Sequence, residues 1–474
     1  SLQYYVPNAY QGLVGRLTYE YASRYLAEFN MGYNGTENFA KGKRFGFFPA
    51  VSLGWVISEE KFFPKNNIVK YLKVRGSYGE VGNDQIGGDR FLYLPSSYGA
   101  ASDSGVNKYN FGLASNPYTS LMIVENKIGN PDLTWEKAKK MNVGVDINLF
   151  NNCLTASFDI FKEKRNNILA NRSTSPMIIG ANLPAYNFGE MENRGWEMDL
   201  NFRHHIQDFH YWARFNYSFA RNEIIYMDEV QKRYDYQMTT GRRKNQFFGL
   251  IFDGYYNSWE EINALDRPKS SWSGNQLQPG DVKYVDVNQD GVIDDYDMVP
   301  IGYTPVPEII YGFSFGAQYK GFDFSILFQG ADNVSIKYFG RSMWPFAKGE
   351  ESAKSLIKER WTQERYEAGE KITFPRLSLN PNGETDHNYR PSTLWIRDAS
   401  YLRLKNLEVG YTFTGGFVKR LNLNSVRLYF NGSNLFTWTD VVDLDPEAPS
   451  RSGNVEINTY PLQKVYNIGL NINF

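Results

Sequence analysis

The chain has 474 residues and a formal net charge of −1, so its charge favours neither a nucleic-acid partner nor an anionic membrane surface. Its single cysteine, Cys153, excludes an internal disulfide framework and any metal site built from several cysteines. Aromatic residues make up 16% of the chain, which suits aromatic rings at two membrane interfaces better than a soluble enzyme. Mean hydropathy is −0.50, and no apolar run approaches the roughly 20 residues of a spanning helix.

Apolar and polar residues alternate with period two from one end of the chain to the other. Because strand side chains point alternately to opposite faces, each such stretch predicts a strand with one apolar face. Four stretches have these apolar members: Leu13, Gly15, Leu17, Tyr19 and Tyr21; Tyr25, Ala27, Phe29, Met31 and Tyr33; Ile309, Tyr311, Phe313, Phe315, Ala317 and Tyr319; and Tyr466, Ile468, Leu470, Ile472 and Phe474.

The connections between these stretches are alternately very short and very long. Tight turns are predicted at Ser23-Arg24, Asn151-Asn152, Gln207-Asp208 and Lys320-Gly321, and long segments lie near 83–134, 171–191, 228–307 and 333–394. A water-soluble antiparallel sandwich shows the same alternation, but its strands usually run about five or six residues. Strands of ten or more residues with short turns on one side predict a transmembrane antiparallel β-barrel, with the short side periplasmic.

Counting back from the C-terminus gives about thirteen strands, whereas bacterial single-chain barrels have even counts. We therefore expect residues 1–474 to be the C-terminal part of a barrel that is incomplete without a strand beside the first one. Since no signal peptide precedes Ser1, an N-terminal part of the protein is expected to be missing. Leu402 and Leu404 are out of phase with Leu407, which predicts a bulge near Lys405-Asn406.

The sharpest local motif is an acidic segment at residues 286–297. It has the spacing of an EF-hand calcium loop, with Gly291 at the sharp turn and Asp297 in place of the usual Glu. The predicted ligands of a structural Ca²⁺ are Asp286, Asn288, Asp290, Val292 (through its backbone carbonyl), Asp294 and Asp297. The alternative is an acidic turn that only solvates itself.

Candidate catalytic residues are weak, so we expect no enzyme and no catalytic site. Gly312-Phe313-Ser314-Phe315-Gly316 matches the nucleophile-elbow pattern, but it lies within a strand alternation where the small residues face the lumen. His204, His205 and His210 gather at a predicted periplasmic turn. The lumen-facing positions include Arg16, Glu20, Glu28 and Arg214, which suits a watered or filled interior.

Several segments, taken in chain order, form distinctive motifs: Arg24–Leu26 with Phe48–Trp55, Asn130–Glu136, Glu192–Glu197, Gly280–Tyr284, Arg397–Asn406, Asn434–Phe436 and Asp445–Glu447. Together these motifs resemble those of SusC/RagA-type TonB-dependent outer-membrane transporters of Bacteroidetes. The resemblance covers the whole chain in order and departs at 31–39, in a predicted surface loop.

This resemblance implies a barrel of about 22 strands with an N-terminal plug, of which this chain lacks the plug and roughly nine strands. It also implies TonB-dependent import of oligomeric nutrients across the bacterial outer membrane, with oligosaccharides favoured over oligopeptides as the cargo. The implied partners are the TonB complex, reached through the missing N-terminal part, and a SusD-like surface lipoprotein, with a dimer of transporter–lipoprotein pairs.

Two other functions stay open at this point. One is a passive porin-like barrel, and the other is a secreted β-rich protein that binds glycans. The substrate-binding residues are unknown, although Trp272, Tyr303 and Trp344 are expected to be exposed loop aromatics that could stack on sugar rings or pack against the lipoprotein.

Overall fold

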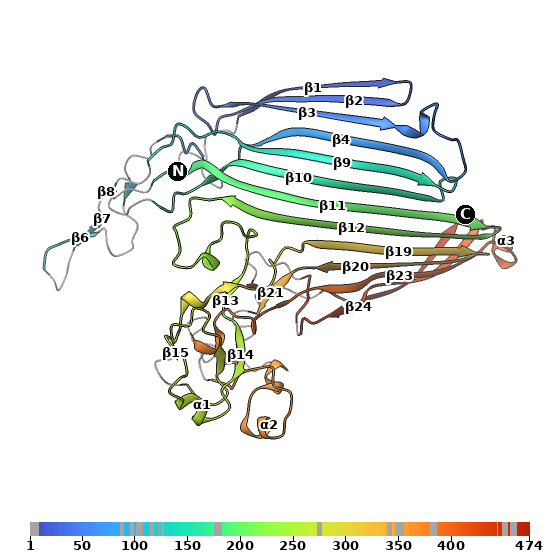
Figure 1. The fold of residues 1–474 in the computed structure, drawn as a ribbon. Helices are drawn as coiled ribbons and strands as arrows, with labels where there is room; N and C mark the ends of the chain where they lie inside the picture. Colours follow the sequence, from blue (N-terminus) through green and yellow to red (C-terminus); the bar gives the residue numbers. More distant parts are fainter. Residues whose placement is uncertain are drawn as a thin grey trace.

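The computed structural model contains one large antiparallel sheet whose thirteen strands follow one another in chain order (Figure 1). It describes residues 9–85, 90–94, 99–100, 108–113, 118–121, 123–124, 128–174, 183–272, 277–338, 344–346, 355–378, 386–442, 444–447, 454–455 and 462–474. The sheet strands are β1 (Tyr10–Tyr21), β2 (Tyr25–Thr36), β3 (Phe45–Val56), β4 (Val69–Asn83), β9 (Glu136–Leu149), β10 (Leu154–Ala170), β11 (Tyr186–Ile206), β12 (Phe209–Tyr226), β19 (Ile309–Tyr319), β20 (Phe322–Asp332), β23 (Tyr401–Phe413), β24 (Ser425–Thr439) and β26 (Val465–Asn473). The predicted strand number is confirmed.

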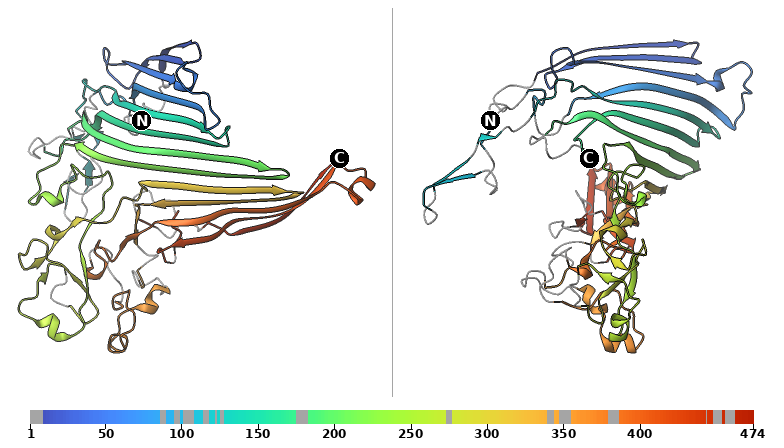
Figure 2. Two further views of the ribbon diagram at one scale, coloured as in Figure 1. Left: turned by 45° about the vertical axis from the view of Figure 1, so that its right-hand side comes forward. Right: turned by 60° about the vertical axis from the view of Figure 1, so that its left-hand side comes forward.

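The sheet curves into an open wall, with β1 and β26 at its two edges (Figure 2). Among the described strands these two edges do not pair with each other. The short connections gather at one end of the wall and the long ones at the other (Figure 1). All four predicted tight turns are confirmed, and backbone φ is positive at Ser23, Asn151, Gln207 and Lys320.

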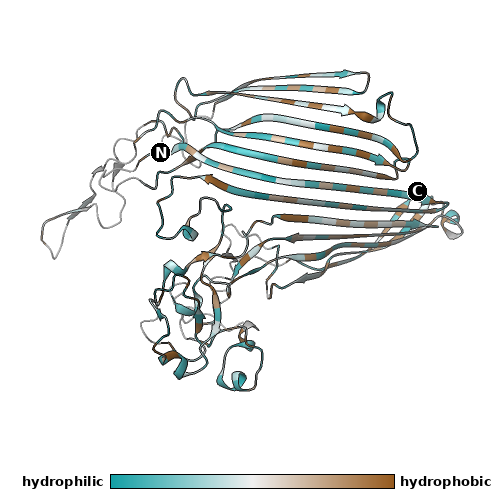
Figure 3. Ribbon diagram, in the orientation of Figure 1, coloured by the Kyte–Doolittle hydropathy of each residue, from teal (hydrophilic) through white to brown (hydrophobic). Residues whose placement is uncertain are grey.

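Residues of high and low hydropathy alternate along the strands of the wall (Figure 3). Because successive strand side chains point to opposite faces, the two faces of the wall differ in character. Register places Leu17 opposite Phe29 and Ile160 opposite Trp196 on one face, the outer face. The neighbouring positions on the same strands, such as Arg16, face the other way because a strand has period two. The outer face is therefore apolar and aromatic and the inner face polar, as predicted.

The predicted bulge is confirmed in β23. Leu404 pairs with Phe328 and Asn406 with Leu327, so Lys405 is an extra residue with no position opposite it on β20. The register against β24 also shifts between Leu404 and Asn406, but there two residues, Asn434 and Leu435, face the single residue Lys405. The bulge keeps Leu402 and Leu407 on the same, outer face although they lie five positions apart, an odd number that would put them on opposite faces of a regular strand.

Four neighbouring strands, β9 to β12, have 14 to 21 residues, and β11 is the longest. β11 begins at Tyr186, so the loop before it ends earlier than the predicted boundary near residue 191. No helix within the described part of the chain is long and apolar enough to cross a membrane.

The long connections after β12, β20 and β24 fold together into a module beside the long-loop end of the wall (Figure 1). Its elements are β13 (Phe248–Gly249), β14 (Phe252–Tyr255), α1 (Trp259–Asn263), β15 (Lys269–Ser270), β16 (Val282–Tyr284), β17 (Val292–Ile293), β18 (Val299–Pro300), β21 (Ser335–Tyr338), α2 (Gln363–Glu367), β22 (Ile396–Asp398) and β25 (Asn454–Val455). Elsewhere lie β5 (Gly99–Ala100), β6 (Lys108–Phe111), β7 (Tyr118–Leu121), β8 (Ile123–Val124) and α3 (Phe417–Arg420). The main buried cluster belongs to this module, with Leu250, Val282, Tyr338, Phe374 and Trp395 at its centre.

Candidate functional site

The inner face of the wall carries arginine–carboxylate networks that span several strands. Arg75 on β4 donates from Nη1 and Nη2 to the two oxygens of Asp159 on β10, each at 2.6 Å. Its Nε donates to Asp146 on β9 at 3.1 Å. Gly144 makes room for this network, because a Cβ there would lie 2.6 Å from Asp159 Oδ1 and 2.7 Å from Arg75 Cζ. The network binds three strands together while leaving its net charge at −1.

A second network lies on the same face nearer the C-terminus. Arg427 on β24 bonds Asp323 on β20 and lies 2.6 Å from Glu408 on β23. Gly410 lies beside it, where a Cβ would be 2.7 Å from both Arg427 Nη2 and Asp323. Both networks are built from charge-assisted hydrogen bonds on a polar surface that the sequence pattern assigned to the lumen.

Between β1 and β9 the inner face forms a hollow of about 510 Å³. Its polar lining includes Thr18, Glu20, Glu28, Lys73, Arg75 and Asn142. Arg16 lies next to it and pairs with Glu28 at 2.6 Å. The predicted lumen residues Arg16, Glu20 and Glu28 are thus brought together, whereas Arg214 lies farther along the wall on β12.

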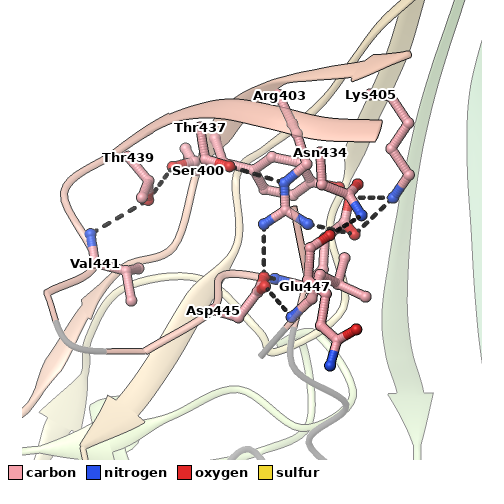
Figure 4. Close-up of polar contacts among 12 residues, drawn as sticks. Ser400, Arg403, Lys405, Asn434, Thr437, Thr439, Val441, Asp445 and Glu447 are labelled. Atoms are coloured by element: carbon pink, nitrogen blue, oxygen red, sulfur yellow. Dashed lines mark hydrogen bonds and ion pairs between the residues drawn. The ribbon is translucent and has the colours of Figure 1, made fainter. Parts of the chain in front are cut away.

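A buried clasp attaches the last long loop to the wall (Figure 4). Arg403 on β23 is 2% exposed, and its guanidinium lies 2.7 Å from Asp445 and 3.0 Å from Glu447. Lys405, the bulge residue, adds a contact of 2.9 Å to Glu447. Two motifs that resemble the SusC family therefore form the two halves of one ion-paired contact.

Hydrogen bonds set the charge state of this clasp. Burial by itself would raise the pKa of Asp445, but bonds from Arg403 and from the backbone N–H groups of Glu447 and Leu462 outweigh it and lower that pKa. Tyr338 reinforces the attachment, since its hydroxyl accepts the N–H of Val442 at 2.8 Å. The loop is thus held by both charge and backbone bonds.

The module contains a buried polar centre around His387. Its Nε2 donates to the carbonyl of Val282 at 2.7 Å, which leaves Nδ1 to accept the hydroxyl of Ser270 at 2.8 Å. Burial lowers the pKa of His387, so the ring is neutral. Nearby, Asp281 pairs with Arg376 at 2.5 Å and accepts from Asn388. These bonds close the module between segments more than 90 residues apart.

The three loop aromatics that were expected to be exposed, Trp272, Tyr303 and Trp344, are half-buried or buried. Trp344 is only 7% exposed and packs against Tyr389 in the module core, so that expectation is wrong. Trp272 is half-buried under the guanidinium of Arg390, 4.0 Å from its ring centre. These side chains therefore stabilise the loop module.

The acidic segment 286–297 folds around its own side chains beside β17. Gly291 has φ +82°, as its place at the sharp turn requires. Asp286 Oδ2 accepts the N–H of Gly291 at 2.8 Å, and Asp290 Oδ1 accepts that of Val292 at 2.9 Å. The other oxygen of Asp286 is buried and has no hydrogen-bond partner among the residues that the structure describes.

Asp297 closes the same segment from inside. It is completely buried and accepts backbone N–H groups of Val287 and Asp294, and its burial raises its pKa. No three His, Cys, Asp or Glu side chains in the described ranges lie together as a preformed metal cluster. The predicted ligand set also includes the side chain of Asn288 and the backbone carbonyl of Val292, which are not among these four side-chain types.

The remaining sequence candidates keep structural roles. His205 and His210 face each other across the β11–β12 hairpin, with ring centres 5.5 Å apart. Ser314 lies inside β19, opposite Arg214, and not on a strand-to-helix turn, so the elbow pattern is a strand. Sequence reasoning missed the His387 centre, because no spacing signal links it to Val282.

Comparison with known proteins decides the family. A family model described as "TonB dependent receptor-like, beta-barrel" matches residues 3–435. The chain belongs to this family. It is a wall segment of an outer-membrane barrel, and its resemblance to SusC/RagA-type proteins is confirmed. The family consists of receptors and transporters.

The TonB-dependent receptor P3 of Formosa agariphila is 28% identical over 97% of this chain, and the TonB-dependent receptor SusC of Bacteroides thetaiotaomicron is 28% identical over 99%. The chain spans 45% and 44% of their lengths. A solved structure titled as the RagAB peptide transporter has a TM-score of 0.74 at 23% identity and covers 98% of this chain and 47% of that one. This last likeness shows the fold alone.

Proposed function

We propose that the whole protein imports oligomeric nutrients across the outer membrane with energy delivered by TonB, and that this chain supplies part of the channel wall. The observation that carries the proposal is the polar inner face of a wall whose outer face is apolar. On this inner face Arg75 and Arg427 form carboxylate networks, and each network packs against a glycine. A wall of this kind encloses water and polar contents. The curated relatives of about twice the length are named as TonB-dependent receptors.

We favour oligosaccharides over oligopeptides as cargo. Inner-face arginines such as Arg75 and Arg427 are paired with carboxylates, and Asn142, Asn216 and Asn406 line the same face, so these parts of the wall offer many hydrogen bonds and locally paired charges. Hydroxyl-rich neutral chains suit such a surface better than peptides with charged termini. RagAB, whose solved structures are described as those of a peptide importer, makes oligopeptides the competing class.

We further propose a SusD-like surface lipoprotein as partner, with two transporter–lipoprotein pairs in one assembly. The loop module lies at the long-loop end of the wall, where a partner outside the cell would meet it (Figure 1). The resemblance of the chain to SusC/RagA-type transporters supports this proposed pairing.

Uptake by cells tests these proposals. Cells that carry the full-length protein should accumulate labelled oligosaccharide, and deletion of tonB should abolish accumulation without changing the amount of folded barrel. Uptake that persists without TonB would support a passive pore and contradict energised import. Mass spectrometry of material that copurifies with the complex should find glycan, whereas peptide alone would reverse the assignment of cargo.

We also propose that segment 286–297 binds one structural Ca²⁺. The buried, unpartnered oxygen of Asp286 and the turn at Gly291 support this, because calcium takes six to eight hard oxygens in a flexible cage. Asp286, Asn288, Asp290, Val292, Asp294 and Asp297 would hold the ion. Binding would draw the carboxylates closer than they now lie and stiffen the loop.

Proteolysis of the full-length protein with and without calcium tests the site. Calcium should protect residues 228–307 from cleavage, and EDTA should remove that protection. The double variant Asp286→Asn/Asp290→Asn should lose the calcium effect, while Glu260→Gln, an exposed acidic residue of α1, should keep it. Equal cleavage rates with calcium and with EDTA would contradict the calcium site and favour an acidic turn that only solvates itself.

A further inference from the structure

The outer face of the wall carries three cations in one row above its apolar belt. Lys162 on β10 lies directly opposite Arg194 on β11, and Arg194 lies directly opposite Arg221 on β12. One step lower on the same faces lie Ile160, Trp196 and Phe219, which also pair with one another. The row therefore marks the height at which the outer face changes from apolar to charged.

The residues below the row identify that height as the outer membrane interface. Trp196 stacks on Tyr217 with ring centres 4.7 Å apart, and Phe158 adds a third ring at 5.8 Å from Trp196. Aromatic girdles of this kind lie at the level of the lipid headgroups in outer-membrane barrels. Since the long loops lie beyond the row, the headgroups it meets belong to the outer leaflet.

Like charges directly opposite one another destabilise a sheet unless counter-charges offset them. Two of the three cations have such partners: Lys162 lies 2.9 Å from Glu192, and Arg221 lies 2.8 Å from Glu308. Arg194, in the middle, is exposed and has no ion pair or hydrogen bond of its side chain among the described residues. Within the described part of the chain, the middle cation of the row is therefore without a counter-charge.

We propose that this row binds a phosphate group of the glycolipid in the outer leaflet. Arginine matches phosphate with two parallel N–H donors, and Lys162 and Arg221 lie on either side to add further donors. The stems of such side chains can lie along apolar surface while their charged ends reach the headgroups. The apolar belt beneath the row meets the acyl chains of the same lipid. This inference concerns the outer surface and does not depend on the proposed transport.

The test measures glycolipid retained by the full-length receptor after purification in mild detergent. The double variant Lys162→Gln/Arg194→Gln should retain roughly tenfold less phosphorylated glycolipid than wild type. Arg214→Gln removes an exposed arginine from the inner face of β12 and should leave retention unchanged. Heat-modifiable migration in gels checks that each variant is a folded barrel.

Two further arms identify the chemistry. In vesicles, the receptor should bind phosphorylated glycolipid and should lose this binding when the phosphates are removed enzymatically. Inorganic phosphate at millimolar concentration should not compete with the glycolipid for the row. Equal retention by wild type and the double variant would overturn the proposal. Equal losses in the double variant and Arg214→Gln, or undiminished binding of dephosphorylated glycolipid, would overturn it as well.

Discussion

Replacing Arg403 with methionine should release the last long loop from the wall. Methionine keeps most of the buried stem but removes the charge that lies between Asp445 and Glu447 (Figure 4). Removing one partner of a buried ion pair costs about 3–5 kcal/mol, because the other partner is left without its counter-charge. Lys405 still pairs with Glu447, so we expect the lower part of that range.

The loop can relieve this cost by detaching, so the effect should be local. A loss of about 3 kcal/mol corresponds to a roughly hundredfold rise in the population of the detached loop. Hydrogen exchange of the full-length receptor should show this rise at the amides of Val442, Glu447 and Leu462, which now donate within the clasp. Because the pKa of Asp445 is lowered, its contribution is complete above about pH 4 and is lost as pH falls below that.

Arg427→Met provides the matched control. It removes an arginine from another arginine–carboxylate network, on the inner face, and should leave exchange in the last loop unchanged. Unchanged exchange of these three amides in Arg403→Met would refute the clasp as the attachment of the loop.

Three other changes test the wall and the module. Gly144→Leu should displace Arg75 and lower the unfolding temperature of the barrel, at a cost of about 1–3 kcal/mol in the free energy of unfolding. Gly76→Ala should leave the unfolding temperature unchanged, because its Cβ would meet only a backbone carbonyl at 3.8 Å. Heat-modifiable migration in gels measures both variants. Deleting Lys405 removes the bulge and would turn Arg403 toward lipid, so the amount of assembled barrel in the outer membrane should fall sharply. An unchanged amount of barrel would show that the register does not depend on Lys405. Because burial lowers the pKa of His387, protection of the module from hydrogen exchange in wild type should be complete above about pH 6.5 and should fall as pH drops below it. His387→Leu should abolish this pH dependence. Protection that does not change with pH in wild type would contradict the prediction.

The wall could be predicted from the sequence because its rules are local. Period-two alternation fixed the faces around Leu17 and Phe313, and the phase change after Leu404 located the bulge without any knowledge of its neighbours. Turn residues such as Gln207 and Lys320 marked the tight connections, where positive φ confirmed them.

The module could not be predicted in the same way, because its contacts join distant segments. His387 bonds Ser270 and Val282, each more than 100 residues away, and no periodicity connects them. Trp344 was expected at the surface, since composition does not distinguish a buried loop aromatic from an exposed one. The family-like motifs around Arg403 and Glu447 were visible as separate segments, but their pairing appears only in three dimensions.

The central claim is that one face of this wall meets lipid and the other a water-filled lumen. Single cysteines placed along β10 from Ala156 to Phe161, after replacement of Cys153, test it most directly in the full-length receptor. A water-soluble maleimide should label positions 157, 159 and 161, whereas a lipid-confined quencher should reach probes at 156, 158 and 160. Labelling without this alternation, or with the two sets exchanged, would contradict the account.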